Sequence, residues 1–283
     1  MRAVFVADKF SDSYIGGAEL SIQTHIDSCR LPLVKVLSKE FNPSKFKPKK
    51  DFLIFGNYSD LNRAHFAAIA DFKYVIEECD YKYCAYRSSH KHKAMALKPC
   101  DCHTNECGKQ IVEFMKKARH IFWKSERQRG EYFRLFPDLG FQMGTVVGGV
   151  FSDEDIDFIL SLRGTPRDEK YFVLYSGHWI KGHRDSVDYC RDHKLDYREV
   201  GNIAYRDSLK MMAKSKGVVY MPRGFDVSCR MITEAKLLGI EIVTNDLIQH
   251  MTEDWFDGTE EERLAFLRSR NKEFWRVVED LAK

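Results

Sequence analysis

Residues Pro222 to Val243 read PRGFDVSCRMITEAKLLGIEIV, which passes from a loop through a helix into a strand. Gly224 suits the loop, Ser228 is the predicted helix N-cap, and Gly239 is expected to end the helix before an apolar strand. Apolar residues repeat at helical spacing between these signals, at Met231, Ile232, Ala235 and Leu238. A loop, a helix and a strand in this order are typical of an α/β domain.

Two carboxylates, those of Asp226 and Glu234, stand eight positions apart across this predicted loop and helix. The spacing brings both carboxylates to one ligand. An acidic loop residue followed by a helix N-terminus is suited to bind sugar hydroxyls and a phosphate. We therefore expect a polyol and phosphate site here.

The chain of 283 residues is long enough for two domains, each with its own core. Its composition, 44% hydrophobic and 31% charged, is typical of a soluble globular protein, and no apolar run approaches the length of a transmembrane helix. Met1 to Asp8 predicts a buried strand rather than a secretory signal, so we expect a cytoplasmic protein, in the host cytoplasm if a phage encodes it. A net charge of +3 is too small to indicate nucleic acid or membrane binding.

Short apolar runs alternate with helical patterns in both halves of the chain, which predicts an α/β fold with parallel sheets. The expected strands are Arg2–Ala7, Leu33–Leu37, Phe52–Phe55, Lys73–Ile76, Ile121–Trp123, Gly144–Val147, Tyr171–Ser176, Tyr197–Val200, Gly217–Tyr220 and Ile240–Val243. The expected helices are Ala18–Ser28, Gly108–Arg119, Glu126–Phe136, Asp153–Leu162, Lys181–His193, Tyr205–Lys214 and Cys229–Leu238. We place a domain boundary near Val150, giving domains 1–150 and 151–283. Thr259 and Glu262 form a predicted capping box that opens a last helix.

Gly16 and Gly17 follow the first predicted strand and open a helix. Glycine lets the backbone approach a ligand, and the free N–H groups of a helix start point at an anion. A glycine pair is by itself more often only a turn. It indicates a phosphate site only together with other signals.

These motifs resemble those of GT-B glycosyltransferases of the retaining group 4 type. The donor-site motif of that family is an acidic residue, seven others, Glu, then Ala and a small-residue turn, and Asp226 stands where the family usually has Glu. The Gly-Gly-x-Glu that begins at Gly16 stands after the first strand, as it does in the family. The resemblance covers most of residues 1–250. It implies two Rossmann-like domains that face a cleft, an acceptor-side domain followed by a nucleotide-sugar domain, and a last helix that crosses back.

The resemblance also implies a nucleotide-diphosphate sugar donor, retention of anomeric configuration, and no metal or other cofactor for catalysis. Glu234 would bind the ribose, Asp226 the sugar hydroxyls, and Lys181 the diphosphate, while Gly16 and Gly17 would line the cleft. The family has an Arg near the Lys position where this chain has none. The residues that could replace it or add contacts to the donor are His178, Arg184, Arg223, Phe225, Val227 and Ser228. The candidates for a general base are His90, His92 and His103.

Five of the eight cysteines fall in an insert of the first domain, at about residues 79–107. Cys84, Cys100, Cys102 and Cys107 could hold a structural zinc ion that clips an insert with little apolar sequence. The alternative is a set of reduced thiols in a cytosolic loop, because disulfides are disfavoured there.

The same insert is basic, with interleaved tyrosines such as Tyr81, Tyr83 and Tyr86. Cations and rings together are typical of nucleic-acid binding, although charge runs are more often solvated surface. The sequence therefore leaves a glycan or a hydroxymethylated base of phage DNA as the acceptor of a glycosyl transfer. Two rival functions are a non-catalytic nucleotide or nucleic-acid binding module on a decayed transferase fold, and another GT-B type enzyme such as a phosphorylase or epimerase.

Overall fold

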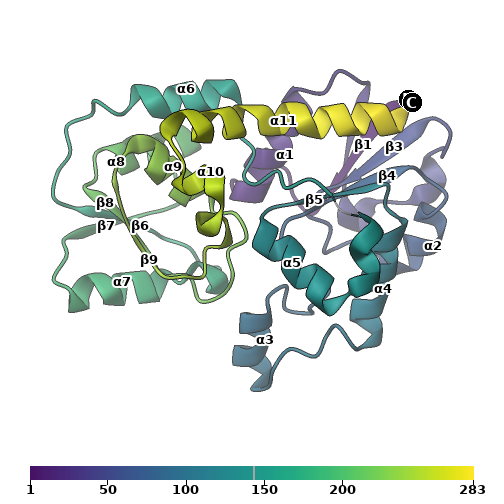
Figure 1. The fold of residues 1–283 in the computed structure, drawn as a ribbon, viewed down its shortest axis with the longest axis horizontal. Coiled ribbons are helices and arrows are strands. Elements are labelled where there is room, and N and C mark those ends of the chain that lie inside the picture. Colours follow the sequence, from purple (N-terminus) through teal and green to yellow (C-terminus); the bar gives the residue numbers. More distant parts are fainter. Residues whose placement is uncertain (143) are drawn as a thin grey trace.

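The computed structural model describes residues 1–142 and 144–283, and it contains two parallel sheets (Figure 1). The first sheet has the strand order β2-β1-β3-β4-β5. These strands are β1 (Arg2–Ala7), β2 (Leu33–Leu37), β3 (Asp51–Phe55), β4 (Tyr74–Glu78) and β5 (His120–Trp123). The helices among them are α1 (Gly17–Asp27), α2 (Phe66–Ile69), α3 (Ser89–Ala96), α4 (Glu106–Lys117) and α5 (Glu126–Leu135).

The second sheet has the order β7-β6-β8-β9. Its strands are β6 (Tyr171–Leu174), β7 (Tyr197–Val200), β8 (Gly217–Tyr220) and β9 (Glu241–Thr244). The remaining helices are α6 (Asp153–Ser161), α7 (His183–Asp192), α8 (Tyr205–Ala213), α9 (Arg230–Leu238), α10 (Asp254–Asp257) and α11 (Glu260–Ala282). None of the helices in the described ranges is long and apolar enough to cross a membrane.

Both faces of the first sheet are covered. Successive residues of β1 point to opposite faces, and each face packs into a different apolar cluster. Val4 and Val6 belong to one apolar cluster, whereas Ala3 and Phe5 belong to the other. The second cluster also takes Phe274 of α11. Helix α11 opens with the predicted capping box, which the structure confirms, and it lies along both halves of the molecule (Figure 1). We propose that the two domains divide near Val150, between the sheets.

Most expected strands lie within two residues of their predicted ends, but three predictions need correction. Gly144–Val147 is no strand, since only Val146 forms a bridge, to Trp123. Ser228 does not cap α9, because the N-cap is Cys229. The insert is not poor in packing, since Tyr81 and other residues of it are buried in the first domain's core and it contains helix α3.

Candidate active site

The loops that follow the first strand of each sheet meet between the two domains. The Tyr14 hydroxyl lies 2.9 Å from Nε2 of His178. A Cβ at Gly17 would lie 3.9 Å from the side chain of Arg230, so α1 of the first domain begins beside α9 of the second. A Cβ at Gly16 would come within 2.7 Å of the Tyr14 ring. Three of the predicted donor-site residues therefore line the interdomain boundary.

Lys181 and Asp226 form an ion pair at the carboxyl end of the second sheet. The Lys181 Nζ donates to Oδ2 of Asp226 over 2.7 Å, and the Tyr220 hydroxyl donates to the same oxygen over 2.6 Å. Tyr220 ends β8, and Asp226 is fixed by its backbone N–H, which donates to the Leu247 carbonyl. Asp226 is buried, whereas 33% of the Lys181 side chain is exposed. The ammonium is thus held in place by Asp226 on a side chain that is one third exposed.

The two charges of this pair stabilise each other. Burial would raise the pKa of Asp226, but the Lys181 ammonium and the two hydrogen bonds outweigh burial and hold that pKa below its ordinary value. Burial would lower the pKa of Lys181, yet Asp226 raises it overall. Both groups are therefore charged near neutral pH. A fixed ammonium beside a carboxylate is suited to bind a phosphate oxygen and a sugar hydroxyl.

A tight turn at Gly182 holds Lys181 in this position. Gly182 has φ +56°, and a Cβ there would lie 1.7 Å from the Met221 carbonyl oxygen. The Ser186 hydroxyl donates to the Gly182 carbonyl over 3.0 Å and accepts the Met221 N–H over 2.9 Å. The start of α7 is thereby tied to the residue that follows β8.

Replacing Gly182 with alanine is expected to lower the free energy of unfolding by about 2–4 kcal/mol, because the side chain would meet both a left-handed backbone and a carbonyl. Urea unfolding followed by tryptophan fluorescence measures the loss. Gly177→Ala is the matched control. Gly177 lies in the same loop, and a Cβ there would meet no atom of the described residues within 4 Å. Equal unfolding midpoints for the two variants would contradict this account of the turn.

Glu234 and Arg230 lie on α9, and Tyr205 begins α8. Within the described ranges, Glu234 contacts these two residues and not the Lys181–Asp226 ion pair. The Tyr205 hydroxyl donates to Oε1 of Glu234 over 2.8 Å, and Nε of Arg230 lies 3.3 Å from the same oxygen. Among the described residues, both hydrogen bonds to this carboxylate go to Oε1 and none goes to Oε2. Burial raises the pKa of Glu234 against the opposing effect of Arg230.

Sequence reasoning missed Arg230 and Tyr205. Arg230 is 4% exposed, its guanidinium donates to the Val150 carbonyl, and it lies 3.3 Å from Asp155 Oδ2. The available signal was the spacing of Arg230 and Glu234, since residues four apart share one face of a helix. Arg230 connects α9 to the segment between the two sheets.

The N-terminus of α9, at Cys229, lacks a side-chain cap in the described ranges. The Ser228 hydroxyl oxygen is buried and has no hydrogen-bond partner among the described residues. Uncapped N–H groups and an unpaired hydroxyl are ready donors to a phosphate or sugar oxygen.

The structure places the other predicted donor residues differently. Arg184 is exposed at the start of α7, and Arg223 Nε donates to Asp185 over 2.5 Å. Phe225 and Val227 point into the first domain's apolar cluster, so that only their backbone groups are free to reach a donor.

His178 lies among cations. Burial lowers the pKa of His178, and Lys181, Lys9, Arg87 and Lys91 lower it further. A neutral imidazole surrounded by positive side chains indicates a region with a positive potential. Such a potential favours a diphosphate.

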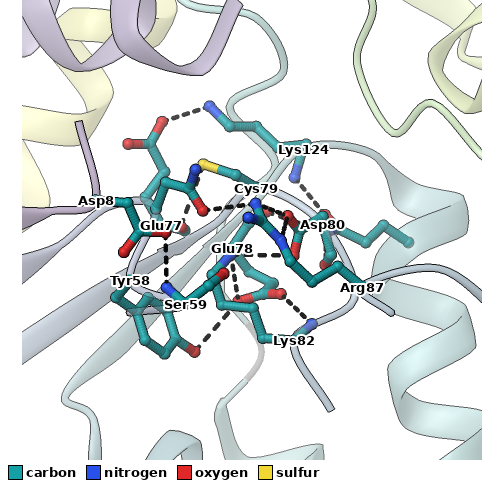
Figure 2. Close-up of polar contacts among 12 residues, drawn as sticks. Asp8, Tyr58, Ser59, Glu77, Glu78, Cys79, Asp80, Lys82, Arg87 and Lys124 are labelled. Atoms are coloured by element: carbon teal, nitrogen blue, oxygen red, sulfur yellow. Dashed lines mark hydrogen bonds and ion pairs between the residues drawn. The ribbon is translucent and has the colours of Figure 1, made fainter. Parts of the chain in front are cut away.

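The first domain contributes a buried polar network at the end of β4 (Figure 2). Glu78 accepts hydrogen bonds from the Tyr58 hydroxyl over 3.3 Å and from the Tyr132 hydroxyl over 2.8 Å. Glu77 pairs with Lys124 from the end of β5. These contacts fix the carboxyl ends of β4 and β5.

The same network positions Arg87 (Figure 2). Arg87 has φ +59°, and its Nε donates to Oδ2 of Asp80 over 2.6 Å. Its guanidinium also donates to Oδ1 of Asn57 over 2.7 Å. A cation on the first-domain side is thereby held near the His178 region.

A cavity of about 520 Å³ lies between α3 and the second domain. It is lined by His90, Lys93, Ala94, Trp179, Asp185, Met221, Pro222, Arg223 and Asn245. Lys181, Asp226 and Glu234 do not line it. Of the three histidines proposed as bases, His90 lines this cavity, while His92 and His103 do not.

The insert contains a cluster of potential metal ligands. Cys84, Cys100 and Cys102 lie together as predicted, but the fourth member is His92. Cys107 is exposed in the first turn of the next helix, α4, and lies outside the cluster.

No protein-family model and no curated protein matches the chain. It is similar to the crystal structure of Anabaena Alr3699/HepE in complex with UDP and glucose, with a TM-score of 0.55 and 13% identity over 100% of this chain and 92% of that one. It is also similar to trehalose-6-phosphate synthase, in a structure concerned with glycosyltransfer with retention, with a TM-score of 0.54 and 9% identity over 99% of this chain and 96% of that one. The chain has the GT-B fold with two Rossmann-like domains, as its sequence predicted.

Proposed function

We propose that the chain is a glycosyltransferase that moves a sugar from a nucleotide-diphosphate donor to an acceptor hydroxyl with retention of configuration. The observation that carries the proposal is the ion pair between Lys181, just before α7, and Asp226, in the loop that leads to the uncapped N-terminus of α9. Breaking the bond between the anomeric carbon and the diphosphate leaves negative charge on the leaving group, and fixed cations and helix N–H groups stabilise that charge. The likeness in fold to a retaining enzyme supports retention.

In this proposal Lys181 and the N–H groups of α9 bind the diphosphate, and Asp226 binds hydroxyls of the sugar. Oε2 of Glu234 accepts from a ribose hydroxyl, while Tyr205 and Arg230 hold its Oε1. Gly16 and Gly17 let the start of α1 approach the donor and the acceptor. No metal takes part in the transfer.

The acceptor is a hydroxyl of a glycan or of a hydroxymethylated DNA base, and the first is the better supported. Tyr81 and Tyr83 are 2% and 3% exposed, so these rings cannot stack on bases. Tyr86, at 36%, is the exposed tyrosine of the basic insert. Nucleotide release from a panel of uridine, guanosine, adenosine and cytidine diphosphate sugars tests the donor. Adding simple glycans or hydroxymethylcytosine DNA in separate arms tests the acceptor.

Glu234→Ala is expected to weaken binding of the donor nucleotide by about 10–100-fold, because it removes a charged hydrogen-bond acceptor worth about 1.5–3 kcal/mol. Calorimetric titration of the released nucleotide measures the affinity. Glu261→Ala is the control, since Glu261 is exposed on α11. Unchanged affinity in a folded Glu234→Ala protein would show that the ribose assignment is wrong.

A non-catalytic nucleotide-binding module is the second candidate. It is favoured by the positions of Arg184 and Arg223, because the first is exposed and the second is paired with Asp185, so that neither joins Lys181. Nucleotide that raises the melting temperature without release from any donor would support this candidate over the transferase.

A further inference from the structure

Four side chains of the insert converge on one point although they come from three segments. Cys84 follows β4, His92 lies on α3, and Cys100 and Cys102 lie in the loop between α3 and α4. Their ligand atoms all lie within 4.8 Å of one another. Cys84, His92 and Cys102 are 2–4% exposed. Thiols and an imidazole gathered in this way are typical of a metal site.

The separations fit a tetrahedral ion. Ligands at zinc–sulfur and zinc–nitrogen distances of about 2.3 and 2.0 Å stand about 3.5–3.8 Å apart around a tetrahedron. Sγ of Cys100 lies 3.5 Å from Sγ of Cys84. Nδ1 of His92 lies 3.8 Å from Sγ of Cys84 and 3.3 Å from Sγ of Cys102. A disulfide does not explain this arrangement, because its sulfurs would stand at about 2.05 Å and the imidazole would have no role.

The far side of the histidine ring also fits metal binding. Nε2 of His92 is buried, has no hydrogen bond from the described residues, and lies 3.9 Å from Oδ1 of Asp101. A histidine that binds a metal through one nitrogen usually directs the other toward a carboxylate or carbonyl. Asp101 stands between the two cysteines, so it is placed for this second contact.

We propose that Cys84, His92, Cys100 and Cys102 bind one structural Zn²⁺ ion, which holds α3 against the second domain. Four protein ligands close the coordination shell, so the ion has no open position for catalysis.

The packing of α3 shows what the ion would hold. The ring centroids of His90 and Phe225 are 4.4 Å apart. A Cβ at Gly224 would lie 2.9 Å from the Ser88 hydroxyl and 3.1 Å from Cβ of His90. His90 and Lys93 also form one wall of the 520 Å³ cavity. Since His92 belongs to the same short helix, a zinc ion on His92 would fix this wall.

Zinc content of the full chain, purified without metal-affinity resin and measured by mass spectrometry, tests the proposal directly. About one zinc per chain is expected. Cys84→Ser and Cys102→Ser are expected to lose the ion, whereas Cys107→Ser, which alters an exposed thiol outside the cluster, keeps it. Cobalt in place of zinc is expected to give the thiolate charge-transfer and tetrahedral absorption bands of a Cys₃His site.

Trypsin adds a readout that is independent of transferase activity. Chelation, or either cluster variant, is expected to speed cleavage after Lys91 and Lys93 at least about tenfold, because α3 loses its anchor. Re-added zinc restores protection in the chelated protein.

Several results would overturn the proposal. One is a chain that holds neither zinc nor cobalt after exposure to each, and another is iron in place of zinc. A third is loss of zinc in Cys107→Ser to the same extent as in Cys84→Ser. If the cluster variants fail to fold, the metal content and the cobalt spectrum of the unaltered chain still decide the question.

Discussion

Lys181→Ala is expected to slow nucleotide release from the donor by about 10²–10³-fold. This is the usual effect of removing one fixed group that stabilises charge developing in the transition state. The Lys181 ammonium is anchored by Asp226 and a third of its side chain is exposed, so in the proposed site we expect it to meet a phosphate without reorganising. A nucleotide-release assay at saturating donor separates the rate from binding. Since the charge develops during bond breaking, kcat should fall more than the affinity for the donor.

The variant also leaves Asp226 buried without its cation, and this effect must be separated from catalysis. The double variant Lys181→Ala/Asp226→Asn removes the unpaired charge, so it should regain stability but not activity. Lys210→Ala, an exposed lysine on α8, is the control for charge alone. A folded Lys181→Ala protein with an unaltered rate would exclude Lys181 from the diphosphate site.

The sheet framework could be predicted because local patterns determine it. β1, β2, β7 and β8 have their predicted bounds. β1, β2 and β8 are mostly apolar runs between polar or turn residues, whereas β7, with the sequence YREV, is half polar. The error at Gly144–Val147 has a physical reason. Val147 is fully buried and its N–H donates to the Trp123 carbonyl, so the segment is apolar because it packs beside β5, although it pairs at only one residue.

The candidate site could be predicted only where neighbours in the sequence form it. The Asp226 loop and the start of α9 are local, and so is the turn at Gly182. Arg230 contacts Val150 and Asp155, which lie about 80 residues away in the sequence. No local sequence pattern predicts contacts over that separation. The fourth member of the cysteine cluster, His92, lies on α3, which brings it to the three cysteines. The sequence did not predict α3. His92 therefore could not be chosen over Cys107 from spacing.

Lys124→Met is expected to lower the free energy of unfolding by about 3–5 kcal/mol, because it leaves a buried carboxylate without its main cation. Lys124 and Glu77 are 4% and 0% exposed, and Nζ of Lys124 also donates to the Gly148 carbonyl over 3.0 Å. Urea unfolding at pH 7 measures the loss. Adding Glu77→Gln to the Lys124→Met variant should restore part of the lost stability. Lys216→Met, which breaks an exposed ion pair with Glu169, should leave the unfolding midpoint unchanged.

The pH dependence distinguishes a buried charge from a packing defect. Burial would raise the pKa of Glu77, but Lys124 and His25 lower it from 4.5 to about 2. A depressed pKa means that this carboxylate stabilises the unaltered protein fully above pH 4.5, and that the stabilisation is lost as the pH falls toward 2. In Lys124→Met, burial acts with only His25 to oppose it, so the pKa of Glu77 rises and protonation relieves the variant. The deficit should therefore be largest near pH 7 and shrink as the pH falls through 4.5. A deficit that stays constant over this range would point to lost packing of the lysine stem rather than to the charge.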